Sequence, residues 1–357
     1  MKRQVILSKP RLLRRAQLNG LSKGGEHPLW SPARFKPRGR IQLIIALFAI
    51  FCLCGNRDGT AQEKIRIGIS AVSLGFLPTI VAEKKGFYSK QGIQSEHILV
   101  PCAIATNALL SEDLDYAVCT GPGIAGAIKG LPIKLVMTTQ DKLGYLLLVK
   151  QSVQKLTDLR GKTIGISTFG SQLYLTTVTL FRRFGMEPGK DVNLIPGGDN
   201  SARIAAMDGG KIDAAFVSSP SDIFGAKRGY KVLLWSRDHV PLLQNAVVAT
   251  DKQIKIAPDK VKRTIKASIE ALRFIREQPE ETIGIAAKWL KLDLATTRAA
   301  FENYLPCYSA DGSLPDQALQ DLIQYELDRG NLKKNIPLTQ VASRALLQQA
   351  QKELNLR

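Results

Sequence analysis

The tetrapeptide Ile67-Gly68-Ile69-Ser70 recurs 97 residues later as Ile164-Gly165-Ile166-Ser167, and a polar, glycine-containing loop follows each copy. A second match comes in the same order, because Asp115–Pro122 recurs 98 residues later as Asp213–Pro220. In both members of this pair an apolar run ends in a hydroxyl residue, a small residue and a proline. Two matches with nearly equal offsets indicate an internal repeat, which a single match would not. We therefore expect two similar halves.

Short apolar runs alternate with amphipathic segments from residue 62 onward. Their length and β-branched content predict buried strands, at Ile65–Ser70, Ser95–Pro101, Tyr116–Thr120, Lys134–Thr139, Lys162–Ser167, Val192–Pro196, Asp213–Ser218 and Lys231–Ser236. Helical periodicity between them predicts helices, at Leu77–Lys85, Ala103–Leu110, Gln172–Phe184 and Ser201–Met207. Alternating strands and helices predict an α/β protein with parallel sheets and helices on both sheet faces.

The C-terminal part has few strand-like runs and is helical by periodicity. The predicted helices are Pro258–Gln278, Glu280–Lys291, Leu294–Tyr304, Pro315–Arg329 and Thr339–Asn355. Two extended stretches, Tyr145–Lys150 and Asn245–Thr250, flank the second half of the repeat. Placed there, they would let the chain cross to a second lobe and return. We expect one lobe of residues 62–149 with 246–357, covered by the helical tail, and a second lobe of residues 150–245.

The first 61 residues differ in composition from the rest. The formal net charge of the chain is +19, and residues 1–40 alone contribute +10 of it. An apolar run, Ile41–Leu53, follows and is too short to span a bilayer, which takes about 20 residues. A basic segment, a short apolar run and the small residues Gly59-Thr60-Ala61 predict a cleaved secretory signal. The basic excess is therefore attributed to a leader and not to a nucleic-acid-binding domain.

Three alternatives for the leader stay open. It could be retained as an N-terminal anchor, or lipidated at Cys54, although Leu53 and Phe51 depart from the usual lipoprotein pattern. The first 40 residues could also come from a start codon read too far upstream. After the leader, Cys102, Cys119 and Cys307 allow at most one disulfide within the chain, and the pairing is not determined.

The strand tips of the repeat are the candidate site. In open α/β sheets ligands bind beyond the carboxyl ends of strands, where loops and helix N-termini expose backbone N–H groups. Four such tips follow from the repeat: Ser70–Phe76, Thr120–Pro122, Ser167–Gln172 and Ser218–Pro220. Other roles are possible for single residues, because Ser171 could be a plain helix N-cap and Phe76 a core aromatic residue. The turn at Ser218–Pro220 could do no more than start a helix.

Catalytic and metal-binding patterns are sparse. His97 and His239 each lie next to a strand-like run rather than in a strand-tip loop, and Asp199 and Asp222 are expected to be solvated. The sequence contains no His-Glu-x-x-His, Gly-x-Ser-x-Gly or phosphate-binding Gly-x-x-x-x-Gly-Lys-Ser/Thr motif. We therefore predict binding rather than turnover, with no cofactor and no metal.

Several motifs resemble one family. Gly75–Pro78 followed by Ala82–Tyr88 resembles the opening of the periplasmic substrate-binding proteins of the nitrate, sulfonate and taurine transport class, whose relatives bind thiamine pyrimidine precursors. Lys162–Ile166 with Gly170-Ser171, and Gly209–Ala215, resemble second-lobe signatures of the same family. The resemblance implies the type II periplasmic-binding-protein fold, with two lobes, two hinge strands and a C-terminal helical cover.

The same resemblance implies a function. Such a protein captures a small polar or anionic organic molecule between its lobes and delivers it to the permease of an ATP-driven (ABC) importer, as an extracytoplasmic monomer. The positions that bind ligand in relatives match Ser73, Phe76, Thr120, Gly121, Gly170, Ser171, Gln172, Ser218 and Ser219. Relatives that synthesise a thiamine pyrimidine carry a cysteine-rich motif that this chain lacks. An enzyme of pyrimidine-precursor metabolism and a sensory ligand-binding module remain the alternatives.

An anion-selective site often contains an arginine. None occurs in the four strand-tip loops. Arg203, shortly after Gly197-Gly198-Asp199, is the nearest candidate, and we expect it to lie solvated on a helix surface.

Overall fold

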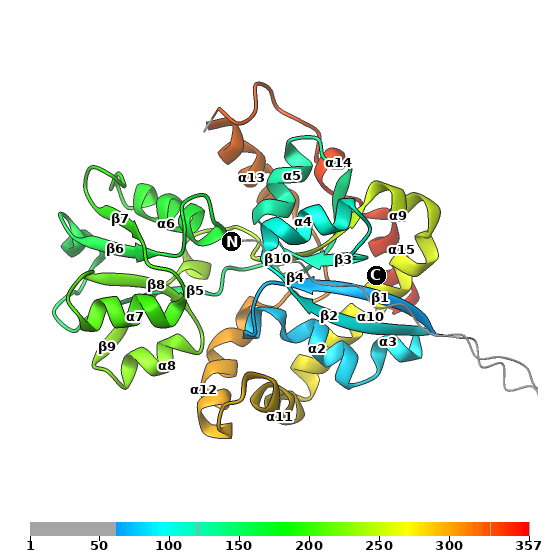
Figure 1. Cartoon of the computed structure of the whole chain (residues 1–357), viewed down its shortest axis with the longest axis horizontal. Helices are drawn as coiled ribbons and strands as arrows, with labels where there is room; N and C mark the ends of the chain where they lie inside the picture. The colour runs from blue at the N-terminus through cyan, green and yellow to red at the C-terminus, as the bar shows by residue number, and fades with distance from the viewer. Residues whose placement is uncertain (1–61, 120, 329, 357) are drawn as a thin grey trace, which may run out of the picture. The chain divides into compact units, whose positions relative to one another are not determined.

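The computed structural model describes residues 62–119, 121–328 and 330–356, so the predictions for the leader, including cleavage after Ala61 and lipidation at Cys54, lie outside the described residues. Figure 1 shows two sheets with helices packed on them. The first has the order β2-β1-β3-β10-β4, built from β1 (Glu63–Ile69), β2 (Ile93–Leu99), β3 (Tyr116–Val118), β4 (Ile133–Gln140) and β10 (Asn245–Thr250). The second has the order β7-β6-β8-β5-β9, built from β5 (Tyr145–Lys150), β6 (Thr163–Ile166), β7 (Asn193–Pro196), β8 (Ala214–Ser218) and β9 (Tyr230–Trp235).

The internal repeat extends to residue-level register. In the first sheet Ile67 pairs with Tyr116 and Gly68 with Ala117. In the second sheet the equivalent strands pair Ile164 with Ala214 and Gly165 with Ala215. The two sheets also share one strand order when β6 to β9 are set against β1 to β4. The predicted pair of similar α/β halves is therefore confirmed.

The prediction of purely parallel sheets is wrong for one strand in each sheet. β10 runs antiparallel to β3 and β4, and β5 runs antiparallel to β8 and β9. Tyr145 at the start of β5 pairs with Ser218 at the end of β8, and Asn245 at the start of β10 pairs with Gln140 at the end of β4. Each crossing strand thus enters its sheet at the carboxyl edge and must run against the parallel strands. Both sheets are mixed.

The pairing also locates the crossings between the sheets. β5 belongs to the second sheet and β10 to the first, so the chain crosses through residues 141–144 and 236–244. The boundaries expected at 149/150 and 245/246 therefore fall inside paired strands. We call residues 62–142 with 245–356 the first lobe and residues 143–244 the second lobe.

Helices surround both sheets. Before β10 these are α2 (Leu77–Lys84), α3 (Phe87–Lys90), α4 (Cys102–Leu110), α5 (Gly121–Ile128), α6 (Gln172–Arg183), α7 (Asn200–Asp208) and α8 (Ser221–Ala226). The tail contains α9 (Asp251–Ile256), α10 (Pro258–Glu277), α11 (Pro279–Leu290), α12 (Leu294–Tyr304), α13 (Asp316–Asp328), α14 (Leu338–Val341) and α15 (Ala345–Glu353). Short 3-10 turns occur at η1 (Leu74–Phe76), η2 (Leu156–Leu159), η3 (Ser236–Asp238) and η4 (Leu305–Cys307). None of the helices in these described ranges is both long and apolar enough to cross a membrane.

The last predicted helix is interrupted. Ala342 is extended (φ −130°, ψ 142°) and forms a parallel bridge with Leu135 of the edge strand β4. Ser343 N donates to Leu135 O at 2.9 Å, so the tail covers part of that exposed edge. Pairing of a sheet edge outweighs helical propensity at this point, because unpaired edge groups are otherwise left open.

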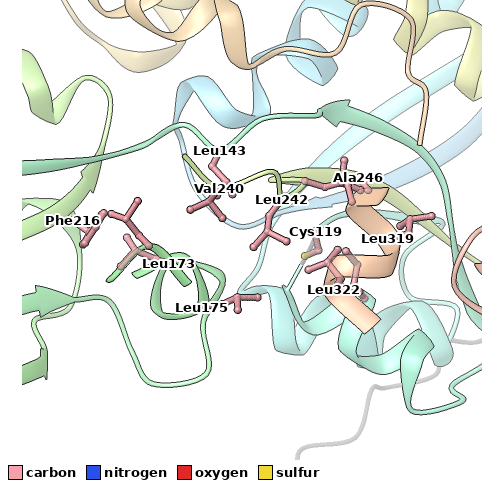
Figure 2. Packing of buried hydrophobic residues seen from close by; sticks show 14 of the residues in the cluster. Cys119, Leu143, Leu173, Leu175, Phe216, Val240, Leu242, Ala246, Leu319 and Leu322 are labelled. Atoms are coloured by element: carbon pink, nitrogen blue, oxygen red, sulfur yellow. The ribbon is translucent and has the colours of Figure 1, made fainter. Parts of the chain in front are cut away.

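One apolar cluster runs through both lobes along the crossing segments (Figure 2). Leu143, Val240 and Leu242 of the crossings are at most 3% exposed. They belong to the same cluster as Leu173 of the second lobe and Leu322 of the first. A second cluster fills the opposite face of the first sheet, under α2 and α10. The crossings are therefore packed segments rather than free linkers.

Candidate ligand-binding site

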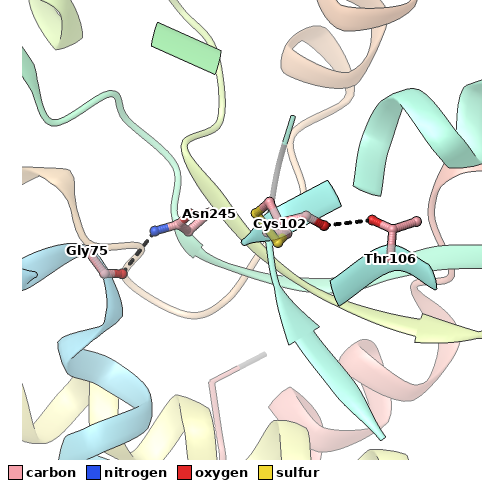
Figure 3. The surroundings of a disulfide bond; sticks show 5 residues. Gly75, Cys102, Thr106 and Asn245 are labelled. Carbon is pink, nitrogen blue, oxygen red and sulfur yellow. Dashed lines mark hydrogen bonds between the residues drawn. A yellow bond between two sulfur atoms is a disulfide. The ribbon is translucent and has the colours of Figure 1, made fainter. Parts of the chain in front are cut away.

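The loop after β1 is tied to the crossing strands. Asn245 Nδ2, at the start of β10, donates to Gly75 O at 3.0 Å and to Gln140 Oε1 at 2.7 Å. Figure 3 shows the Asn245–Gly75 bond. Ser73 is partly exposed, extended, and does not cap η1 with its side chain. The first strand tip thus has a backbone held by Asn245 and a partly exposed serine.

Phe76 is a core aromatic residue, which was the alternative to a ligand contact. Its side chain is 6% exposed and lies in the cluster beneath the first sheet with Leu77 and Ile80. The aromatic ring that is exposed near a strand tip is Phe169, at 60%. It lies edge-on to Tyr174 with ring centroids 5.5 Å apart.

The tips of β3 and β6 come together from different lobes. Thr120 lies outside the described residues, and Gly121 is the first residue of α5. A Cβ atom at Gly121 would lie 3.5 Å from the backbone nitrogen of Gln172 and 3.7 Å from its Oε1. Gln172 Nε2 donates to Leu243 O at 3.3 Å, while its buried Oε1 has no partner among the described residues. Two residues predicted from separate halves are therefore neighbours.

Ser171 caps α6, as its alternative interpretation proposed. Its Oγ accepts from Tyr174 N at 3.1 Å and donates to Thr168 O at 2.7 Å. Because the single hydroxyl hydrogen of Ser171 is donated to Thr168 O, Ser167 is the donor in the 2.8 Å hydrogen bond between Ser167 Oγ and Ser171 Oγ. Gly170, just before the cap, has φ +76°, a conformation that favours glycine.

Four of the predicted residues, Gly121, Gly170, Ser171 and Gln172, line a hollow of about 250 Å³. Its walls come from the loop after β6 and from the helices α5, α6 and α13. The lining residues are Gly121, Ile124, Ala125, Ile128, Gly170, Ser171, Gln172, Leu175, Leu322, Tyr325 and Glu326. Sequence reasoning did not include α13, because its apolar periodicity indicates only that one face is covered. The hollow is smaller than the 300–1,000 Å³ common for ligand pockets.

The tip of β8 carries two serines with different surroundings. Ser218 is partly exposed, and its Oγ accepts from Asn200 Nδ2 at 3.0 Å. Ser219 is buried and donates to Asp222 Oδ1 at 2.7 Å. Asn303 Nδ2 of α12 donates to Asp222 Oδ2 at 2.9 Å. Ser219 thus contributes to an interlobe contact, and the expectation of a solvated Asp222 is wrong, since this residue is 4% exposed.

Arg203 is buried, at 2% exposed, and the expectation of a solvated helix surface is wrong for it too. Its Nε donates to Phe216 O at 2.8 Å, Nη1 to Gly198 O, and Nη2 to Asn200 Oδ1 at 2.6 Å. A Cβ atom at Gly197 would lie 2.7 Å from Arg203 Cγ, so the glycine makes room for the side chain. Loss of hydration on burial lowers the pKa of Arg203 to about 10.

The histidines lie away from the strand tips. His97 pairs with Ile67 in the interior of β2, and its Nδ1 is 2.7 Å from Glu83 Oε2. This hydrogen bond lowers the pKa of Glu83 to about 2. His239 lies edge-on to Phe184 with ring centroids 5.3 Å apart. The described part of the chain holds no group of three His, Cys, Asp or Glu side chains that could bind a metal ion.

Cys102 and Cys119 form a disulfide (Figure 3), which sequence reasoning left open. The bond joins the first residue of α4 to the residue after β3, next to the strand tip at Gly121. Cys119 N also donates to Ala246 O at 3.0 Å. Cys307 is free and buried.

Proteins that are named as binding proteins are similar to this chain in sequence. A Brucella abortus protein named only as a binding protein is 27% identical over 246 residues, which cover 67% of this chain and 75% of that protein. The riboflavin-binding protein RibY of Chloroflexus aurantiacus is 24% identical, and the match covers 70% of this chain and 74% of RibY.

Solved structures show the same fold. The periplasmic nitrate-binding protein NrtA of Synechocystis PCC 6803 matches with a TM-score of 0.69 at 16% identity, covering 83% of this chain and 90% of NrtA. The periplasmic aliphatic sulphonate binding protein SsuA of Escherichia coli matches with a TM-score of 0.68 at 17% identity, covering 79% and 92%. The fold is therefore that of the periplasmic binding proteins. The NMT1/THI5-like family model matches residues 74–282, more than half of the chain, and the protein belongs to that family.

Proposed function

We propose that this protein is the extracytoplasmic solute-binding component of an ABC importer. It captures a small polar or anionic organic molecule between its lobes and delivers it to the permease. The proximity of Gly121 and Gln172, which line the same hollow, carries the proposal, because these residues come from strand tips of different lobes that were predicted separately. The structural similarity to nitrate- and sulfonate-binding proteins supports the same class of function.

Ligand contacts are proposed for the described tip residues that remain partly or fully exposed, which are Ser73, Gly121, Gly170, Gln172 and Ser218. Thr120 is proposed with them from its place in the sequence, since it lies outside the described residues. Ser171, Ser219 and Phe76 support the site instead, since the first caps α6, the second bonds Asp222 and the third packs in the core. Gln172 is the strongest single candidate, because its buried Oε1 has no partner among the described residues.

Closure around the ligand would follow from linkage. A ligand that contacts both lobes favours the closed arrangement by its differential affinity for it. The crossings at residues 141–144 and 236–244 are the segments about which the lobes can rotate. Gly144 N donates to Gln244 Oε1, so the two crossings are bonded to each other at this point.

The extracytoplasmic location rests on two observations. The Cys102–Cys119 disulfide belongs to a class of bond that persists in oxidising compartments. The structural relatives named above are periplasmic proteins. We propose a monomer that meets the membrane only through its leader or an anchor there. An enzyme or a sensory module on the same fold is the alternative, and an enzyme would need a titratable group at the tips, where neither histidine lies.

A ligand screen tests the proposal. The full chain is heated with nitrate, bicarbonate, sulfonates, pyrimidines and aromatic acids, and a ligand at 100 times its Kd should stabilise it by about 2.7 kcal/mol. Small-angle scattering with the best ligand should show a smaller radius of gyration. Gln172→Ala should weaken binding by about 3- to 10-fold, while Gln348→Ala, an exposed glutamine on α15, should leave it unchanged. Tight binding without compaction, or equal affinities of the two variants, would contradict the proposed site.

A further inference from the structure

The second lobe contains a buried cation close to a strand tip. Arg203 is 2% exposed, and the hydrogen bonds of its guanidinium group go to two carbonyl oxygens and one amide oxygen. Across the residues that the structure describes, no carboxylate lies within 4.0 Å of it. Asp199, the exposed N-cap of α7, is the acidic residue whose charge acts on it from farther away. The positive charge is therefore only partly compensated within the protein.

The hydrogen bonds from Arg203 to the strand tip have one possible direction. A guanidinium group only donates, so the atom of Asn200 that lies 2.6 Å from Nη2 must be the amide oxygen. The amide nitrogen then faces Ser218 Oγ, at 3.0 Å, and donates to it. The hydroxyl of Ser218 accepts from within the protein, and its own hydrogen is left to point elsewhere.

The other tip hydroxyls of this lobe are arranged differently. Ser167 donates to Ser171, Ser171 donates to Thr168 O, and Ser219 donates to Asp222. Ser218 is the partly exposed serine of this group whose hydrogen has no acceptor among the described residues. It therefore remains available to donate to a guest.

We propose that Arg203 is a positioning residue which, through Asn200, makes the Ser218 hydroxyl a hydrogen-bond donor for the negatively charged group of the ligand. This inference rests on the proposed function and adds to it the charge of the bound molecule, an organic anion such as a sulfonate or a carboxylate. The buried charge of Arg203 favours an anion at the tip. Because Asn200 accepts from Arg203 and donates to Ser218, the hydroxyl hydrogen of Ser218 is left for the ligand. Arg203 itself does not touch the ligand.

The test reverses the hydrogen bond between residue 200 and Ser218 while keeping the shape of the side chain at position 200. Asn200→Asp is nearly isosteric and should retain the Arg203 bond in a stronger, charge-assisted form. The new carboxylate would compensate the guanidinium charge and accept the Ser218 hydrogen, which removes the donor. Affinities are measured for matched pairs of anionic and neutral probes, propanesulfonate with propanesulfonamide and benzoate with benzamide. We expect the variant to lose about 10- to 100-fold in affinity for the anion of a pair, with little change for the neutral partner and an unchanged or higher Tm.

The control is Asn193→Asp, which makes the same chemical change in the same lobe. Asn193 is exposed at the amino end of β7, at the sheet edge opposite the tips, and should bind the anions as the wild type does. Equal anion affinity of Asn200→Asp and wild type, or a wild-type preference for the neutral probes, would overturn the inference and leave the proposed function intact. If no member of the wider panel stabilises the wild type, the proposed function fails and the inference fails with it.

Discussion

Reduction of the Cys102–Cys119 disulfide should destabilise the protein by a predictable amount. The two cysteines are 17 residues apart, and closing a loop of this size lowers the entropy of the unfolded chain. The chain-entropy relation gives about 3 kcal/mol at 25 °C for this loop. With an unfolding entropy of about 2.1 cal/mol/K per residue, the Tm of the folded region should fall by about 5 °C.

The assay compares thermal and urea unfolding of the full chain with and without a thiol reductant. The double variant Cys102→Ala/Cys119→Ala should unfold at a lower midpoint than the oxidised wild type and should not respond to reductant. Cys307→Ala is the matched control, since Cys307 is free and its replacement should leave the response to reductant intact. An unchanged midpoint on reduction of the wild type would refute the loop-closure reasoning.

Three further outcomes are expected. His97→Gln should lower the free energy of unfolding by about 1 kcal/mol at pH 6, a value discounted for the partial exposure of Glu83. Because the pKa of Glu83 is lowered to about 2, this stabilisation is present above its unfolded pKa near 4.5 and is lost as the pH falls through 2. The urea midpoints of variant and wild type should therefore converge in acid. Gly144→Ala would place its Cβ in steric conflict with the Tyr304 ring, and this overpacking should cost about 1–3 kcal/mol in denaturant unfolding. An unchanged unfolding midpoint would indicate that the crossing relaxes freely. Gly170→Ala meets open space but keeps φ at +76°, so it should cost about 1–2 kcal/mol, and an unchanged midpoint would show that this backbone is unstrained.

The strands and most helices could be predicted because their signals are local. Apolar runs gave the bounds of β5 and β10 as the structure has them, and the equal offsets of the repeat anticipated equivalent strands that even share their register. The glycines at 121 and 170 were identified as strand-tip residues for the same reason, since a repeat places equivalent loops at equivalent sheet edges. No local signal indicated that β5 and β10 are antiparallel to their neighbours, because strand direction depends on the edge at which the chain enters the sheet.

What the sequence by itself determined was therefore the α/β class, the duplication and the set of strand tips, all of which depend on neighbouring residues or on spacing along the chain. The tertiary structure decided which side chains at those tips are available. Phe76 and Arg203 became buried, and Ser219 was committed to Asp222 and through it to Asn303, 81 residues farther along the chain than Asp222. It also selected Cys102 as the partner of Cys119. These outcomes depend on distances between residues far apart in the chain, and such distances are set only when the packed core brings the lobes together.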